Sequence, residues 1–299
     1  MADGIHRLLN QLEITRLGRL VVNSRFTVEG QLQGAHPSPL KGFSVEFADY
    51  RQYVPGDDLR HLDWRVYGRS ERLYIRQYEE ECNLRVYLLV DASRSMAYGS
   101  GAQTKYQYAA KLAAAIAYVT VQQQDSVGLT IFTKDREVHL PARGGSQHLR
   151  AMANALADFT PAKETALARQ IHLLAEAVHR RALVILISDG YEDLDALRGA
   201  LGHFRKAKHD VIAYQVLDAA ELDFPFRDIG NFEDLETGAH LITDPRGIRE
   251  AYQEAFGAFL RDLKALCAGM NVDYQLARTD ASFIPFVQNH LHRRLGRRK

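Results

Sequence analysis

The stretch Val86-Tyr87-Leu88-Leu89-Val90-Asp91-Ala92-Ser93-Arg94-Ser95 decides how this chain is expected to fold and where its chemistry lies. Its first five residues are apolar without interruption, which is typical of a strand buried on both faces of a sheet. A carboxylate and two hydroxyls follow directly, each separated by one residue. Such hard oxygen donors in one tight loop suit Mg²⁺ or Mn²⁺. Open α/β sheets also place their ligand sites at the carboxyl ends of strands.

Downstream of this stretch, apolar strands and amphipathic helices alternate. Continuous Val, Ile and Leu strands between helices predict an α/β fold, with a doubly wound, mainly parallel, Rossmann-type sheet covered on both faces. Strands are expected at residues 85–90, 127–133, 182–188 and 211–217, with a hairpin partner at 137–140, and helices at 104–123, 146–157, 165–179 and 192–207. The pattern then weakens, with strands expected at 241–243 and 272–277, helices at 246–266 and 281–295, and a solvated basic tail at 292–299.

The region before residue 82 differs in composition. Residues 5–20 have the apolar spacing of a short amphipathic helix, whereas residues 34–80 are rich in Gly, Pro, Tyr, Asp and Arg and predict turns and short strands. We expect Trp64 to be a buried anchor of this irregular N-terminal segment. We also expect three aspartates of the segment to form ion pairs with nearby arginines. These aspartates are Asp57, Asp58 and Asp63. The expected division is 1–81 for this segment, 82–220 for the α/β domain, and 221–299 for a helical extension.

Composition excludes several classes of protein. The chain has 299 residues and a formal net charge of +1, so no global field favours nucleic acid or a membrane surface. Its two cysteines, Cys82 and Cys267, are isolated, which speaks against a zinc site and predicts two buried apolar side chains. The sequence has no signal-peptide pattern and no apolar run near the ~20 residues that a membrane span needs. A cytoplasmic protein is therefore expected.

Two later residues extend the candidate metal site. Thr165 follows a polar loop at the start of an expected helix, where its hydroxyl could cap that helix or bind a metal. Asp189 ends the expected strand 182–188, so neighbouring parallel strands would bring it close to Asp91. Thr160 is the alternative if Thr165 is not the ligand.

The set Asp91-x-Ser93-x-Ser95, a downstream Thr and a strand-ending Asp-Gly resembles the metal-ion-dependent adhesion site of von Willebrand factor A domains. The resemblance implies that the two serines and the threonine ligate the ion, that the carboxylates assist through water, and that a partner's acidic residue completes the octahedron. These roles would fall on Asp91, Ser93, Ser95, Thr165 and Asp189. In those domains a Gly-rich segment leads to the threonine, whereas this chain has Lys163-Glu164-Thr165-Ala166-Leu167. The match to the motif is therefore weaker at Thr165 than at the other four residues.

Upstream motifs narrow the resemblance. Residues 42–47 (GFSVEF), 55–60 (PGDDLR) and 62–64 (LDW) precede the Asp91 strand in a fixed order. This succession resembles the domain-of-unknown-function family 58, whose members join such a segment to an A-type domain. Members commonly occur beside MoxR-type AAA+ ATPases, which implies an adaptor or co-chaperone that binds proteins. Many carry N-terminal membrane helices, which are not evident in this sequence.

Other functions remain as alternatives. A Mg²⁺-dependent phosphohydrolase could use Asp91 as nucleophile or ligand, but it needs a lysine or second aspartate that no motif supplies. A structural subunit with a vestigial metal site is the third possibility. We expect a binding module and not an enzyme.

Overall fold

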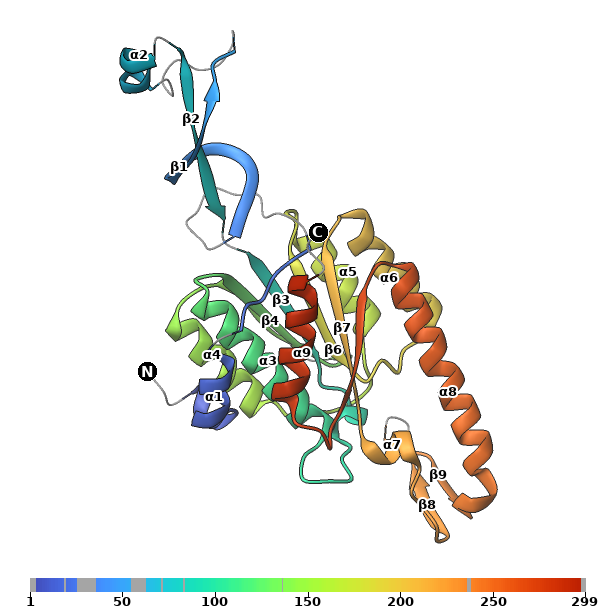
Figure 1. Ribbon diagram of the computed structural model, residues 1–299. Coiled ribbons are helices and arrows are strands. Elements are labelled where there is room, and N and C mark those ends of the chain that lie inside the picture. The colour runs from blue at the N-terminus through green and yellow to red at the C-terminus, as the bar shows by residue number, and fades with distance from the viewer. Residues whose placement is uncertain are drawn as a thin grey trace. The chain divides into compact units, whose positions relative to one another are not determined.

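The computed structural model describes residues 4–18, 20–25, 36–54, 63–70, 72–82, 84–135, 137–235 and 238–296 (Figure 1). The chain divides into two compact units. One comprises Phe26–Leu84, and the other comprises Met1–Arg25 together with Arg85–Lys299. The larger unit contains the residues of the candidate site.

The larger unit is built on a six-stranded sheet, in the order β10-β7-β6-β3-β4-β5. All neighbouring strands are parallel except β5, which runs antiparallel to β4. The strands are β3 (Arg85–Asp91), β4 (Ser126–Phe132), β5 (Glu137–Arg143), β6 (Leu183–Ser188), β7 (Asp210–Leu217) and β10 (Asp273–Arg278). From the central β3 the chain winds first toward β5 and then, from β6, toward β10. This reversal is the hallmark of a doubly wound sheet, and the predicted fold class is confirmed.

Helices cover both faces of this sheet (Figure 1). In one layer α3 packs against α1, α4 and α9, and in the other α6 packs against α5 and α8. These helices are α1 (Gln11–Leu17), α3 (Lys105–Gln122), α4 (Ser146–Asp158), α5 (Leu167–Ala177), α6 (Leu194–Lys206), α8 (Pro245–Gly269) and α9 (Phe283–Gly296). Thr104 and Gln107 form a reciprocal capping box that fixes where α3 begins. Because α3 is rich in alanine, its backbone lies close to the sheet, with much of the helix buried.

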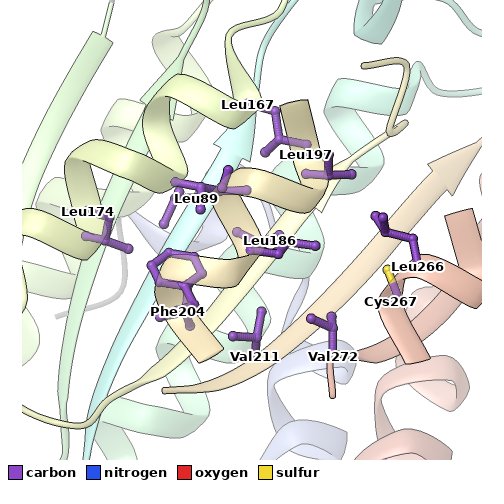
Figure 2. Close-up of a cluster of buried hydrophobic side chains, with 14 of the residues drawn as sticks. Leu89, Leu167, Leu174, Leu186, Leu197, Phe204, Val211, Leu266, Cys267 and Val272 are labelled. Atoms are coloured by element: carbon purple, nitrogen blue, oxygen red, sulfur yellow. The ribbon is translucent and has the colours of Figure 1, made fainter. Parts of the chain in front are cut away.

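The core between the sheet and the α5–α6 layer is apolar throughout (Figure 2). Leu89 and Leu186 contribute from the central strands, and Phe204 of α6, which is fully buried, lies among them. Cys267 belongs to the same cluster, and burial raises the pKa of its thiol to about 11. The prediction of a buried, apolar role is thus confirmed for Cys267; the side chain of Cys82 lies outside what the structure describes.

Several elements differ from the expected ones. The expected helix 5–20 is divided into a short 3-10 helix, η1 (Ile5–Arg7), and α1, because Asn10 caps a new helix start. The expected strand 241–243 is present as β9 (His240–Thr243), but it pairs with β8 (Gly230–Glu233) in a separate hairpin. The two units also divide the chain differently from the three expected segments, since β10 joins the main sheet and residues 4–25 belong to the same unit.

The smaller unit consists, where described, of a two-stranded antiparallel sheet and one helix. β1 (His36–Gln52) is longer than the short strands expected, and its pairing with β2 (Tyr74–Cys82) is irregular in register. The helix α2 (Trp64–Ser70) begins where the Asp63 carboxylate accepts the backbone N–H of Arg65 at 2.9 Å. Trp64 is 64% exposed and contacts Tyr67 edge-on, so the prediction of a buried anchor is wrong. Asp57 and Asp58 lie outside the described residues.

Candidate functional site

The candidate site lies where the direction of winding reverses. β3 and β6 are neighbours in the sheet and parallel, and Val90 pairs with Ile187. Asp91 ends β3, Ser188 ends β6, and Asp189 follows directly, so all three lie at one edge of the sheet. This is the position at which doubly wound sheets bind their ligands, because the loops leaving the two strands diverge there.

Asp91 holds the cluster together. Its carboxylate is fully buried, and Oδ1 accepts the backbone N–H of Ser93 at 2.9 Å. Its Oδ2 accepts the hydroxyls of Thr165 at 2.8 Å and Ser188 at 2.7 Å. Ser188 was missed by sequence reasoning, although its place beside Asp189 at a strand end was a usable signal. Asp91 thus orients one loop and two hydroxyls at once.

Thr165 reaches Asp91 because two loops are joined by backbone hydrogen bonds. The N–H of Ala162 donates to the carbonyl of Ala92 at 3.0 Å, and the N–H of Arg94 donates to that of Lys163 at 2.6 Å. α5 begins at Leu167, and its N-cap Ala166 makes no side-chain capping bond, so Thr165 is not a cap. The structure therefore brings Thr165 to the cluster, whereas the alternative Thr160 is exposed.

The two serines present a pair of hydroxyl oxygens. Ser93 is buried, Ser95 is half-buried, and their Oγ atoms lie 3.0 Å apart. Adjacent ligands of an octahedral Mg²⁺ at about 2.1 Å are separated by about 3.0 Å. The hard oxygen donors and their spacing therefore fit such an ion. Ser93, Ser95 and Thr165 are the residues that would hold it, with Asp91 behind them.

Asp189 makes different contacts. Its Oδ2 accepts the ammonium group of Lys105 at 2.9 Å, and Oδ1 accepts the backbone N–H of Tyr191 at 3.3 Å. Lys105 also donates to Glu221 at 2.7 Å and lies 4.9 Å from the centre of the Tyr191 ring. Lys105 lies at the start of the expected helix 104–123 and was not among the site residues predicted from the sequence. The resemblance implies that Asp189 would assist such an ion through water.

Burial governs the electrostatics of this edge. Burial and the neighbouring charge of Asp189 raise the pKa of Asp91 to about 6, while the bonds from Ser188, Ser93 and Thr165 act the other way. Burial alone would lower the pKa of Lys105, but Asp189 and Glu221 raise it above its ordinary value. Three carboxylates, Asp91, Asp189 and Glu221, lie near one ammonium, that of Lys105, which is bonded to Asp189 and Glu221. The charge balance therefore favours a further cation beside Asp91.

Comparison with known proteins identifies the family. A family model described as "Protein of unknown function DUF58" matches residues 49–258. The chain belongs to the DUF58 family. The family predicted from the sequence motifs is thereby confirmed, and the match spans both compact units.

Relatives and solved structures are also similar to this DUF58 chain. The Mycobacterium tuberculosis protein named "Uncharacterized protein Rv1480" is 29% identical over 264 residues, covering 86% of this chain and 82% of its own. A structure titled as an aerotolerance-related membrane protein from Bacteroides fragilis is 16% identical, covers 71% of this chain and 98% of its own, and has a TM-score of 0.46. The SpRpn10 VWA domain is 11% identical, covers 70% and 95%, and has a TM-score of 0.42. Within the described part of this DUF58 chain, no helix is both long enough and apolar enough to cross a membrane.

A pocket of about 650 Å³ adjoins the cluster in this DUF58 protein. Ser95 and Lys105 form part of its wall, so the pocket and the serine pair share a border. Most of the remaining wall comes from residues 220–235, which include α7 (Ala219–Asp223) and β8, and Tyr98, Tyr191 and Tyr252 of α8 complete it. Arg94, between the two serines, pairs with Glu233 of β8 at 3.4 Å and links the loop to the hairpin. Sequence reasoning predicted nothing of this pocket, because its residues come from distant parts of the chain.

Proposed function

We propose that this DUF58 protein is a divalent-metal-dependent protein-binding module and not an enzyme. Mg²⁺ or Mn²⁺ would be held by Ser93, Ser95 and Thr165, with Asp91 and Asp189 assisting. The observation that supports this best is the pair of serine hydroxyls 3.0 Å apart, on a loop held by buried Asp91. Ser95 borders an open pocket, so the site faces a surface that a partner can reach.

The residues of the site suggest how a partner is recognised. Bound there, the ion would supply a positive charge that attracts a carboxylate. Ser93, Ser95 and Thr165 are neutral donors, so the groups in direct contact with the ion would not themselves neutralise its charge. Asp91 accepts the Thr165 hydroxyl and the backbone N–H of Ser93, so it orients that hydroxyl and the loop that carries the two serines. We therefore expect weak ion affinity without the partner, and a partner that presents an aspartate or glutamate.

The finer proposal concerns the partner and the process. A MoxR-type AAA+ ATPase is the partner that the family resemblance suggests, and this chain would serve as adaptor or co-chaperone in the assembly or activation of other proteins. Such a partnership requires ATP and therefore points to the cytoplasm. No nucleic acid is expected to take part.

Ion binding is tested first on the purified protein. MgCl₂ at about ten times the dissociation constant stabilises the folded state by roughly 1.4 kcal/mol. For a protein of this size we expect the melting temperature to rise by about 2–4 °C. The isosteric variant Asp91→Asn and the variant Ser95→Ala should lose this rise, whereas Ser146→Ala, an exposed serine on α4, should keep it. An equal rise in all four proteins would contradict the proposed ion site.

Partner binding is tested by affinity capture from native lysate. Wild type and Asp91→Asn are compared in the same Mg²⁺ buffer, so that ATP-dependent partners keep their own magnesium. We expect an AAA+ ATPase with the wild type, at least tenfold less with Asp91→Asn, and none after EDTA. Undiminished capture by Asp91→Asn would overturn the metal-dependent mechanism.

The phosphohydrolase alternative gains little from the geometry. The lysine that it lacked is present as Lys105, but this ammonium is fully buried and bonded to both Asp189 and Glu221. A lysine so placed stabilises two carboxylates and is not presented to a substrate. We expect no Mg²⁺-dependent turnover of p-nitrophenyl phosphate above that of Asp91→Asn.

A further inference from the structure

The pocket beside Ser95 has an aromatic interior. Six aromatic side chains line it, and four of them form a continuous set of ring contacts. Phe224 stacks on Tyr252 with ring centres 4.5 Å apart, and Phe226 meets Phe224 at 5.2 Å and Phe232 at 5.4 Å. Phe226, Phe232 and Tyr252 are only half-buried, so these rings remain available to a ligand. The remaining two are Tyr98 and Tyr191.

The backbone of Phe224 is strained to create this interior. Phe224 has φ of 44°, in the left-handed region that a bulky residue rarely adopts. It ends α7 in this conformation, and its ring is 4% exposed beneath the pocket. Tyr252 is fixed as well, because its hydroxyl donates to the carbonyl of Glu221 at 2.9 Å. The rings are therefore preorganised and need not be ordered when a ligand arrives.

Charge selects what the pocket accepts. Among the described residues, its wall carries four carboxylates, Glu221, Asp228, Glu233 and Asp234, and one cationic side chain, Lys105. Lys105 is already bonded to Glu221, and Arg94, which borders the wall, pairs with Glu233. Asp228 is exposed at the rim. An anion is therefore disfavoured, and a cation with an apolar or planar body is favoured.

The chain's own cations already use the rings that bound the pocket. The Arg249 guanidinium lies 5.9 Å from the centre of the Phe224 ring and donates to the carbonyl of Phe226 at 2.8 Å. Lys105 makes the corresponding contact with Tyr191. Guanidinium groups suit such a place best, because they are planar, stack on rings and bind carboxylates with two parallel hydrogen bonds.

The surroundings favour a protein as the source of the cation. Three large apolar side chains on or next to the hairpin are exposed: Ile229 by 70%, Leu241 by 58% and Ile242 by 75%. Asn231 pairs with Ile242, which places Ile229 diagonally opposite Ile242 on one face of the hairpin. Exposed apolar groups beside a pocket with a polar rim are typical of a protein-binding surface. A free small cation would leave them uncovered.

We propose that this pocket binds an arginine side chain of the partner protein, next to the serine pair that would take the partner's carboxylate. This inference rests on the proposed protein-binding function, since it adds a second contact to the same docking surface. The partner segment would then carry an acidic residue and an arginine close together. The pocket, being separate from the ion, should recognise arginine even when no metal is present.

The test uses the full chain and the blocked tripeptide acetyl-Gly-Arg-Gly-amide in EDTA at low salt. Citrulline in place of arginine keeps the shape and removes the charge. Binding is measured by saturation-transfer NMR and calorimetry. We expect the arginine peptide to bind at least tenfold more tightly than the citrulline peptide, and a peptide with lysine in place of arginine to have an intermediate affinity. Equal binding of arginine and citrulline would overturn the proposal, and tighter binding of lysine would overturn the choice of arginine.

Variants locate the binding. Asp228→Asn combined with Glu233→Gln removes two exposed carboxylates of the rim and should weaken the arginine peptide at least fivefold. Asp195→Asn removes a carboxylate that is 91% exposed on α6 and should change nothing. Unchanged binding by the double variant would overturn the proposal. The pocket is measured with the arginine peptide in EDTA, and the ion site by the rise in melting temperature with MgCl₂. A failed metal site and a failed pocket therefore give different results.

Discussion

At the residue scale, the charge of Lys105 stabilises the buried carboxylates at the carboxyl edge of the sheet. It is fully buried at the first position of α3, and its ammonium is bonded to Asp189 and Glu221. Neither carboxylate has another described cation within ion-pairing distance. A buried charge left without its partner is costly, because it has lost water without gaining a compensating bond. Lys105 therefore stabilises the fold while it holds Asp189 beside the candidate ion site.

We predict that Lys105→Met destabilises the protein by about 3–5 kcal/mol, the usual cost of removing one partner of a buried ion pair. Urea denaturation followed by circular dichroism measures this change. Lys134→Met is the matched control, since Lys134 is 55% exposed and pairs with Glu164 on the surface. Such an exposed pair contributes far less, because water and salt screen the two charges. A similar loss of unfolding free energy in both variants would show that the buried ion pairs of Lys105 do not cause the destabilisation.

At the scale of elements, the C-terminal helix α9 is fastened to the sheet by a buried charge network. Arg294 is 7% exposed and donates to Asp210 of β7 at 2.5 Å and to Asp273 of β10 at 2.7 Å. His290, one turn earlier, lies 3.2 Å from the same Asp273 carboxylate. The prediction that residues 292–299 form a solvated tail is therefore wrong for Arg294. Residues 297–299 lie outside the described part.

This network makes stability depend on pH. Burial alone would raise the pKa of Asp273, but His290 and Arg294 bond and attract its carboxylate and hold that pKa below its usual range. In the unfolded chain Asp titrates near pH 3.9, so below about pH 4 the unfolded chain takes up a proton that the folded chain does not. The stabilisation is present above this pH and is lost as the pH falls.

We therefore predict that Asp273→Asn is less stable than wild type at pH 7, and that the difference narrows as the pH falls from about 4 toward 2. Urea denaturation at pH 7, 4 and 3 measures it. Asp195→Asn is the control, since Asp195 is 91% exposed on α6. A difference that stays constant with pH would contradict the role given to Asp273.

At the scale of the whole larger unit, stability resides in the apolar layers on either side of the sheet. Phe204 is fully buried and belongs to the cluster that joins α5, α6 and α8 to the central strands (Figure 2). Its ring also meets His209 edge-on at 5.6 Å. A large side chain surrounded in this way cannot be removed without leaving a cavity.

We predict that Phe204→Ala lowers the free energy of unfolding by about 3–5 kcal/mol, from lost burial and the cavity together. Leu12→Ala, at a position 72% exposed on α1, should change it by less than about 0.5 kcal/mol. Chemical denaturation of both variants decides this. A loss below about 1 kcal/mol for Phe204→Ala would mean that this layer collapses around the gap or is not a main source of stability.

Much of the fold and part of the site could be predicted from the sequence by itself. Apolar runs such as residues 86–90 and 182–188 determined which segments are buried parallel strands, because strand burial is recorded locally in side-chain pattern. The position of Asp91, Ser93 and Ser95 after one of these strands also followed from local order. Thr165 and Asp189 could be named as candidates, but their actual contacts could not.

The tertiary structure alone decided the rest. Ser188, Lys105 and Glu221 come together with Asp91 and Asp189 only because β3 and β6 are neighbours and α3 and α7 meet at their ends. The aromatic pocket and the burial of Arg294 likewise depend on segments far apart in the chain. The local sequence pattern predicts whether a residue is buried, but it does not predict which distant residue that side chain contacts. That choice is made by strand order and helix packing, since a buried polar group is stable only beside a partner that the fold supplies.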